Sequence, residues 1–301
     1  MNIATESKQR STFTFPTTEV LLLLVAIVWG TSYGLTKSAL TYTSVLLFIA
    51  IRFSMTCCCL IPFVLNDIAK QRNKDWIVSL PTGFILAAIF FFEVYGVSKT
   101  TAANAAFLIS LNVIFTAFIQ NIINKEKPSV ELITLCSSSV LGVLLLTDSL
   151  NLSVSLNAGD YCILSAAVLR ALMVTTTRRL TNGKQIANTT LTFVQSFVVA
   201  GCSVIALFTT VEYSIISLPT ELSFWLYVSY LVLFCTLLAF FVQNYAVRKI
   251  SATKTSLLMG SEPLFGAIFA YFWLNETFTA LQLFGAAIIL ISVILTSNRN
   301  I

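Results

Sequence analysis

The sequence contains no histidine and few charged residues of any kind. Of its 301 residues only 10% are charged, whereas 57% are hydrophobic, and the mean hydropathy is +0.87. A soluble domain carries about 25% charged residues, so water is not the main solvent of this chain. The lack of histidine removes the commonest general base and the commonest metal ligand. We therefore expect neither an enzyme nor a bound metal or other cofactor.

Several patterns with a defined chemistry are also missing. No block of five or six like charges occurs, so a nucleic-acid partner is not expected despite the net charge of +5. The H-E-x-x-H motif and the nucleotide-binding loop G-x-x-x-x-G-K-[ST] do not occur, so this chain would not hydrolyse ATP. All cysteines fall in apolar runs, where membrane packing explains them better than disulfides do. They are Cys57, Cys58, Cys59, Cys136, Cys162, Cys202 and Cys235.

Long apolar runs make up most of the chain. A membrane-spanning helix needs about 20 mostly apolar residues, and such runs follow one another with short connectors. The first run is too long for a cleaved signal peptide, so we expect it to be retained as the first span after a cytoplasmic tail, 1–18. The predicted spans of this all-α integral membrane protein are the ten segments 19–40, 43–65, 77–98, 102–123, 130–147, 158–178, 187–209, 222–245, 253–275 and 279–297.

The distribution of basic residues agrees with ten spans and two cytoplasmic termini. Cytoplasmic loops carry an excess of Lys and Arg, and with the N-terminus inside, 14 of the 18 basic residues lie on the cytoplasmic side. Connectors 148–157, 210–221 and 275–278 contain none. The fourteen are Lys8, Arg10, Lys70, Arg72, Lys74, Lys125, Lys127, Arg178, Arg179, Lys184, Arg248, Lys249, Lys254 and Arg299; the other four are Lys37, Arg52, Lys99 and Arg170.

The chain also repeats itself with an offset of 150 residues. The match includes polar residues, which do not recur by chance as easily as apolar ones do in so hydrophobic a chain. The aligned pairs include Tyr95 with Tyr245, Lys99 with Lys249, Glu126 with Glu276, and Phe90 with Phe240. Each repeat, 19–147 and 158–297, holds five spans, so the second copy enters the membrane from the opposite side. Inverted repeats of this kind are typical of transporters whose substrate site lies near the midplane.

Several motifs resemble those of the drug/metabolite transporter superfamily, and specifically its EamA-like family. They are S-E-P-L-F at 261–265, W-L-N-E-T at 273–277, L-F-G-A-A at 283–287, A-A-N-A-A-F-L at 102–108, W-G-T-S-Y at 29–33 and R-F at 52–53. The resemblance implies a ten-helix exporter or permease for amino acids, related metabolites or toxic analogues. Two residues depart from the family pattern: Pro62 follows the R-F pair instead of preceding it, and Arg170 stands where the family often has Trp.

Four ionisable residues inside predicted spans are the first candidates for substrate binding or coupling. Such a group costs at least about 2.5 kcal/mol to insert, so it faces a cavity or a partner. Arg52 is suited to hold a carboxylate, with a structural clamp as the alternative. Glu262, directly before Pro263, is either a proton-coupling carboxylate or the neutraliser of an arginine. Glu93 either has a specific role or is interfacial, and Arg170 either contacts substrate or pairs with Glu93 or Glu262.

Uncharged groups at membrane depth add further candidates, suited to a solute with polar and apolar parts. The same residue types also serve as hydrogen-bonding contacts between helices, and both interpretations stay open. These candidates are Trp29, Tyr33, Asn104, Asn112, Gln195, Gln243, Asn244 and Trp273. The pairs Gly30 with Gly34 and Ser137 with Ser139 are expected at close helix contacts, and Glu126 and Glu276 are expected to be interfacial and structural.

Three functions compete on this evidence. The first is a secondary transporter that exports a small metabolite by alternating access across a bacterial inner membrane, with a proton gradient as one candidate driving force. The second is a membrane scaffold or solute sensor that does not transport. The third, an intramembrane hydrolase or transferase, has little support without histidine. The expected partners are a small-molecule substrate and the lipid bilayer; the cargo, direction, coupling ion and oligomeric state are left open.

Overall fold

The computed structural model describes residues 17–147, 156–211, 217–274 and 277–298, without the side chains of 102, 103, 270, 273, 274 and 298. All regular elements in these ranges are helices. They are α1 (Thr17–Gly30), α2 (Ser32–Ala39), α3 (Val45–Ala69), η1 (Trp76–Ser79), α4 (Leu80–Lys99), α5 (Ala102–Ser110), α6 (Asn112–Ile123), α7 (Val130–Leu146), α8 (Ala158–Thr181), α9 (Asn188–Thr210), α10 (Leu222–Tyr230), the π-helical η4 (Leu231–Leu238), α11 (Ala239–Val247), α12 (Ala252–Met259), α13 (Glu262–Leu274) and α14 (Ala280–Asn298).

The helices follow the predicted spans closely, but not all of them reach spanning length. Within the described ranges, eight helical segments are long and apolar enough to cross a membrane, and α7 is a shorter apolar helix. The ninth predicted span, 253–275, is instead the separate helices α12 and α13. Ten crossings therefore stay a prediction. Glu276, Asp148 and the tail 1–16 lie outside the described residues.

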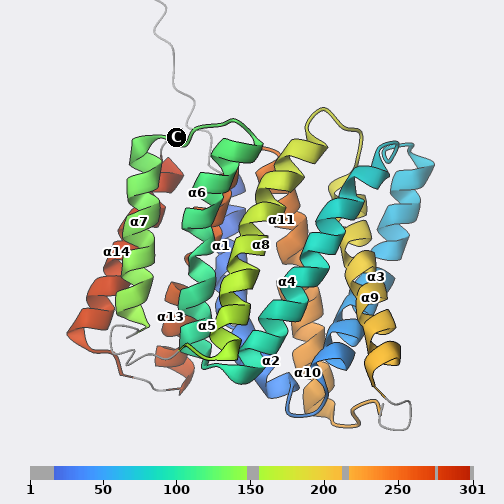
Figure 1. Ribbon diagram of the computed structural model, residues 1–301, viewed down its shortest axis with the longest axis horizontal. Helices are drawn as coiled ribbons and strands as arrows, with labels where there is room; N and C mark the ends of the chain where they lie inside the picture. Colours follow the sequence, from blue (N-terminus) through green and yellow to red (C-terminus); the bar gives the residue numbers. More distant parts are fainter. Residues whose placement is uncertain (1–16, 148–155, 212–216, 275–276, 299–301) are drawn as a thin grey trace, which may run out of the picture.

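The helices lie side by side and run alternately between two faces of the molecule, the upper and lower faces of Figure 1. At the upper face α1 begins, and α3, α6, α8, α11 and α14 end. At the lower face α2, α4, α7, α9 and α13 end. Contacts between helices join distant parts of the sequence: α3 packs on α9, α4 on α8, and α7 on α14.

Three of the predicted spans are broken near their middle. α1 passes into α2 at Thr31, α5 into α6 at Leu111, and α12 into α13 at Gly260 and Ser261. Pro263 is the second residue of α13, so it starts a helix, where its missing amide costs little. The predicted span 253–275 is therefore not one continuous helix kinked by this proline.

Small residues permit the closest helix contacts. A Cβ atom on Gly30 would lie 2.6 Å from the backbone nitrogen of Gly266, and one on Gly142 would lie 2.8 Å from the carbonyl oxygen of Gly285. Thus α1 meets α13, and α7 meets α14, backbone to backbone. Gly34 has no atom within 4 Å of such a Cβ. The expected close helix contact is therefore confirmed for Gly30 and wrong for Gly34. Ser139 is buried in α7.

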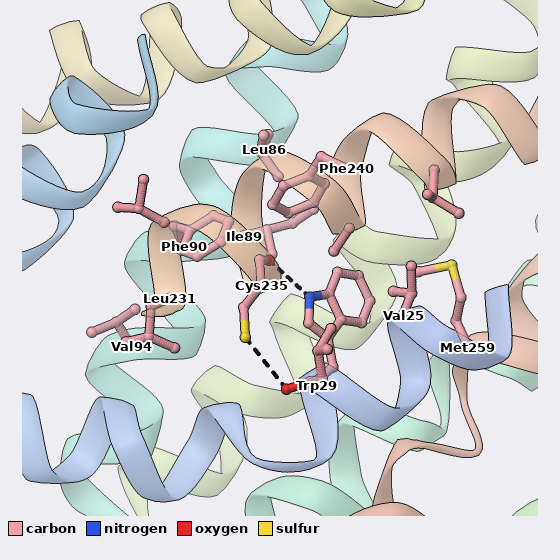
Figure 2. Close-up of a cluster of buried hydrophobic side chains, with 14 of the residues drawn as sticks. Val25, Trp29, Leu86, Ile89, Phe90, Val94, Leu231, Cys235, Phe240 and Met259 are labelled. Atoms are coloured by element: carbon pink, nitrogen blue, oxygen red, sulfur yellow. Dashed lines mark hydrogen bonds between the residues drawn. The ribbon is translucent and has the colours of Figure 1, made fainter. Parts of the chain in front are cut away.

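The cysteines form no disulfide. All seven are free; three are buried, two are partly buried, and Cys58 and Cys59 are exposed on the outer side of α3. The three buried cysteines agree with the expected role in packing. One of them, Cys235, lies in the central hydrophobic cluster drawn in Figure 2.

Candidate functional site

An arginine and two glutamates meet in the middle of the molecule. Arg170 of α8 binds Glu93 of α4 through two nitrogens, with Nη2 2.7 Å from Oε1 and Nε 3.1 Å from Oε2. Its third nitrogen, Nη1, lies 3.8 Å from Oε1 of Glu262 at the start of α13. All three residues are largely buried. We call Glu93, Arg170 and Glu262 the central ion cluster.

Two aromatic side chains from the broken α1–α2 pair complete this cluster. The hydroxyl of Tyr33 donates to Oε1 of Glu262 at 3.0 Å. The guanidinium carbon of Arg170 lies 4.9 Å from the centre of the Trp29 ring, a distance at which a cation is attracted to the ring face. Trp29 is held in place from the other side, because its Nε1 donates to the carbonyl of Cys235 at 2.8 Å (Figure 2).

Beside the cluster lies a row of packed rings, Trp29, Phe240 and Phe90. Their centres are 5.8 Å apart for Trp29 and Phe240, and 5.9 Å apart for Phe240 and Phe90, both in edge-to-face geometry. Figure 2 shows them converging from α1, α11 and α4. Together with Arg170 these rings line a cavity on each side. We call the four residues the septum.

The upper cavity, on the upper-face side of the septum, has a free volume of about 30 Å³. Its polar lining comes from Asn112, Gln243, Ser256 and Glu262. Asn112 is 9% exposed, and its Oδ1 is buried without a hydrogen-bond partner. A buried unpartnered carbonyl is costly, so this atom is an acceptor that a bound solute can use.

The lower cavity has a free volume of about 20 Å³ and is lined by Arg52, Ser32, Thr36 and Glu93, among others. Arg52 is 4% exposed; its Nε donates to Thr236 at 2.8 Å, and its guanidinium lies 5.1 Å from the Phe90 ring centre. Among the described residues no carboxylate lies within 4.0 Å of its nitrogens. Its two terminal nitrogens are therefore available to an anion.

Both cavities are far smaller than the roughly 300 Å³ that a small-molecule pocket needs. A metabolite can enter only if helices around the septum separate. The broken α1–α2 and α12–α13 pairs meet at this point, and breaks allow half-helices to move relative to each other. The helix breaks therefore lie where the chain would have to move to admit such a solute.

Three amide candidates lie away from the cavities. Gln195 donates to Thr82 at 2.9 Å, and Asn244 donates to Gln195 at 2.8 Å, so these two join α4, α9 and α11 as helix contacts. Asn104 lies in the first turn of α5, where its backbone amide binds the capping Thr101. The side chain of Trp273 is outside the described residues.

The sequence did not single out Thr236, Ser256 or the ring pair of the septum. Thr236 lies in the π-helical segment η4, where it accepts from Arg52, and π segments occur often at functional sites. Phe90 and Phe240 are aligned by the 150-residue repeat, which is the one signal that pointed to them. No sequence signal marked Thr236 or Ser256.

Ser32 lies in the sequence G-T-S-Y-G at 30–34, which matches the G-x-S-x-G pattern of hydrolases. In those enzymes the serine sits on a strand-to-helix turn and works with a histidine. Here Ser32 starts α2, after another helix, and the chain has no histidine. The pattern therefore gives no support to a hydrolase. Among the described residues there is also no group of three or more potential metal ligands.

Comparison with known proteins agrees with this arrangement. An uncharacterized transporter of Archaeoglobus fulgidus is 29% identical over 285 residues, which cover 92% of this chain and 85% of the relative. The uncharacterized transporter YyaM of Bacillus subtilis is 26% identical over 291 residues, covering 93% of each chain. A protein of known crystal structure matches 92% of this chain and 95% of its own with a TM-score of 0.75 and 13% identity, which shows a shared fold.

Both halves of the chain also match one family model. Residues 17–148 and 157–298 each match the EamA-like transporter family. With its many candidate spans, the protein is a multi-pass integral membrane protein. The chain belongs to the EamA-like transporter family, as its motifs predicted.

Proposed function

We propose that this protein is a secondary transporter that exports a small metabolite across the bacterial inner membrane by alternating access. The observation that carries the proposal is the central ion cluster. Glu93 comes from the first family match, Arg170 and Glu262 come from the second, and they meet at helix breaks between two cavities. Buried charges of this kind in a membrane protein mark solute or proton pathways.

We further propose ten spans arranged as two inverted five-helix repeats with both termini cytoplasmic. Repeat-related residues have the same surroundings near opposite faces. The Nζ of Lys99 lies 5.9 Å from the Tyr95 ring centre, and the Nζ of Lys249 lies 5.8 Å from that of Tyr245. Thr101 caps α5 just as Ser251, 150 residues later, caps α12. Related helices also pack on each other, namely α3 on α9 and α7 on α14.

The cavities support a cargo with both an acidic and an amino group, such as an amino acid. The lower cavity offers the unpaired terminal nitrogens of Arg52, which suit a carboxylate. The upper cavity offers the unpartnered Oδ1 of Asn112 and the carboxylate of Glu262, which suit an ammonium group. The rings of the septum lie between them, so the apolar part of the solute would contact Trp29 and Phe240.

Proton coupling would act through Glu262. Its carboxylate accepts from Tyr33 and faces Arg170. Protonation would remove the attraction to Arg170 and weaken the link between α13 and α8. A gradient could thereby bias which side of the septum opens.

Flux through everted inner-membrane vesicles tests the transport proposal. We expect labelled amino acids to accumulate with a proton gradient and not after addition of an uncoupler. Glu262→Gln and Arg52→Gln should each lower this flux at least about tenfold, the loss of one charge-assisted contact. Glu126→Gln is the matched control, because Glu126 pairs with Arg178 at the upper face. Full flux in both Glu262→Gln and Arg52→Gln would reject the site. Binding of a labelled amino acid by the wild type without any flux would favour a sensor.

Cysteine labelling tests the topology. In a variant with Cys58 and Cys59 replaced by Ser, we expect Lys99→Cys to react with an impermeant maleimide in intact cells. Lys249→Cys should react only after the membrane is opened. Labelling of both positions from the same side would contradict the inverted arrangement while leaving the transport proposal to the flux assay.

A further inference from the structure

A second, separate pocket lies at the upper face, where the ends of α6, α8 and α11 meet. Its volume is about 510 Å³, far larger than either cavity at the septum. We call it the basic pocket. Its lining residues include Asn124, Lys125, Glu126, Arg178, Arg179 and Arg248.

The charges in this pocket do not balance. Glu126 supplies the single carboxylate of the lining. Five basic residues surround it, namely Lys125, Arg178, Arg179, Lys184 and Arg248. Both oxygens of Glu126 lie 3.1 Å from Nε of Arg178, so this acid is already engaged. The Nζ of Lys184 lies 3.9 Å from Asp75, which is not part of the lining. An excess of positive charge remains around the hollow.

Backbone carbonyls hold the three guanidinium groups in place. Arg178 Nη1 donates to the carbonyls of Val247 and Ile250, at 3.0 and 2.7 Å. Arg179 Nη1 donates to Ile123 at 2.8 Å, and Arg248 Nη1 donates to Ile186 at 2.9 Å. These bonds satisfy the last carbonyls of helices and turns, a common role for Arg.

Capping of helix ends does not account for all of the donors. In each of these arginines Nη2 has no hydrogen-bond partner among the described residues. Partial burial lowers the pKa of Arg248 from its ordinary value, which reflects a guanidinium that has lost water without gaining an acidic partner. The pocket thus presents fixed Nη2 donors that are not paired with any anion among the described residues.

Asn124 adds an independent sign of a missing partner. Both polar atoms of its side chain are buried without a hydrogen bond, although it lines a large pocket. It is the C-cap of α6, and the next residue, Lys125, has a positive φ of 56°. At the wall of a basic pocket, the Nδ2 of such an amide can donate to a phosphate oxygen, and its Oδ1 can accept from a protonated phosphate oxygen.

We propose that the basic pocket binds a phosphate group, supplied either by an anionic lipid headgroup or by a soluble phosphate. Arginine forks and a lysine match the several oxygens of phosphate. Basic pockets between helices at the cytoplasmic surface are suited to anionic headgroups. The neighbouring side of α6 carries the exposed apolar residues Phe118 and Ile122, 67% and 75% exposed, on which acyl chains can lie. A bound phosphate would join the ends of α6, α8 and α11.

Thermal unfolding of the purified protein tests this site. We expect inorganic phosphate to raise Tm in detergent if the source is soluble. If the source is a lipid, we expect nanodiscs with phosphatidylglycerol to raise Tm relative to nanodiscs of phosphatidylcholine. Either result supports the pocket, and the pair of arms distinguishes the sources. No shift in either arm would overturn the proposal.

Matched variants show whether the pocket itself is responsible. The double variant Lys125→Gln/Arg179→Gln should bind the effective ligand at least about tenfold more weakly. Lys70→Gln/Arg72→Gln removes the same charge from exposed residues outside the pocket, and it should bind as the wild type does. Equal loss in both variants would mean that only the general surface charge matters, and would reject the site. Arg179→Lys, which keeps the charge, checks that the protein is folded and should retain partial binding.

Discussion

The helix breaks at Leu111 and at Ser261 are 150 residues apart and occupy equivalent places in the two halves. Each is followed by a half-helix whose first residue lines the upper cavity: Asn112 in the first half and Glu262 in the second. Their side chains differ in charge and in partners. The Oδ1 of Asn112 has no partner, whereas Glu262 accepts from Tyr33 and faces Arg170.

This comparison separates what the fold needs from what one site needs. The break is present in both halves, so it belongs to the shared backbone. The carboxylate is present in only one, so a helix break does not require it. The same holds for Glu93, whose repeat equivalent is the neutral Gln243. We infer that each of these carboxylates serves a task that its neutral counterpart in the other half does not perform.

The largest effect is expected from removing the cation that joins the two halves. Arg170→Met leaves Glu93 and Glu262 buried near each other without a counter-charge. Breaking a buried ion pair in this way costs about 3–5 kcal/mol, so we expect a large drop in the free energy of unfolding in detergent. The triple variant with Glu93→Gln and Glu262→Gln should recover most of it. A single variant as stable as the wild type would contradict the central ion cluster.

A smaller loss of stability is expected from crowding the helix break at Ser261, against which Gly30 packs. A Cβ on Gly30 would lie 2.8 Å from the carbonyl of Glu262 and closer still to Gly266. Gly30→Ala should therefore cost about 1–3 kcal/mol through overpacking, measured by unfolding in detergent. Gly34→Ala is the matched control: nothing lies within 4 Å of its Cβ, and alanine favours the helix by about 1 kcal/mol over glycine. If both variants behave alike, the contact of α1 with α13 is not tight.

Much of this architecture could be predicted from the sequence, because long apolar runs and a 150-residue repeat are properties of the chain itself. The sequence also named Glu93, Arg170 and Glu262, since charges are rare in such runs. Their pairing depends on how α4, α8 and α13 pack, which no local pattern encodes. The break at Leu111 has neither glycine nor proline to mark it. The contact of Arg52 with Thr236 depends on the register of a π-helical segment, which propensity does not predict.

Comparing two buried amides, Asn112 and Asn244, tests the role of Asn112 at the helix break at Leu111. Asn244 donates to Thr192 and Gln195, so Asn244→Ala should cost about 1–3 kcal/mol by leaving buried groups unpaired. Asn112→Ala removes an Oδ1 that has no partner, so it should change stability little while lowering flux. Unfolding and vesicle flux measured on both variants separate the roles. Equal destabilisation would show that Asn112 is a structural contact as well.

The smallest effect on stability is expected at the repeat-related residues Lys99 and Lys249, which lie near the two faces of the molecule and not at the central ion cluster. Lys99 and Lys249 are exposed, and each lies over a tyrosine ring at nearly the same distance, 5.9 and 5.8 Å. An exposed cation–π contact contributes about 0.5–1 kcal/mol, so Lys99→Ala and Lys249→Ala should each lower the free energy of unfolding by no more than this, and by equal amounts. Lys70→Ala, an exposed lysine without such a ring contact among the described residues, should have no effect. Clearly unequal losses would show that the two halves have diverged in local structure as well as in charge, and would weaken the inference that the backbone is shared and the charge is not.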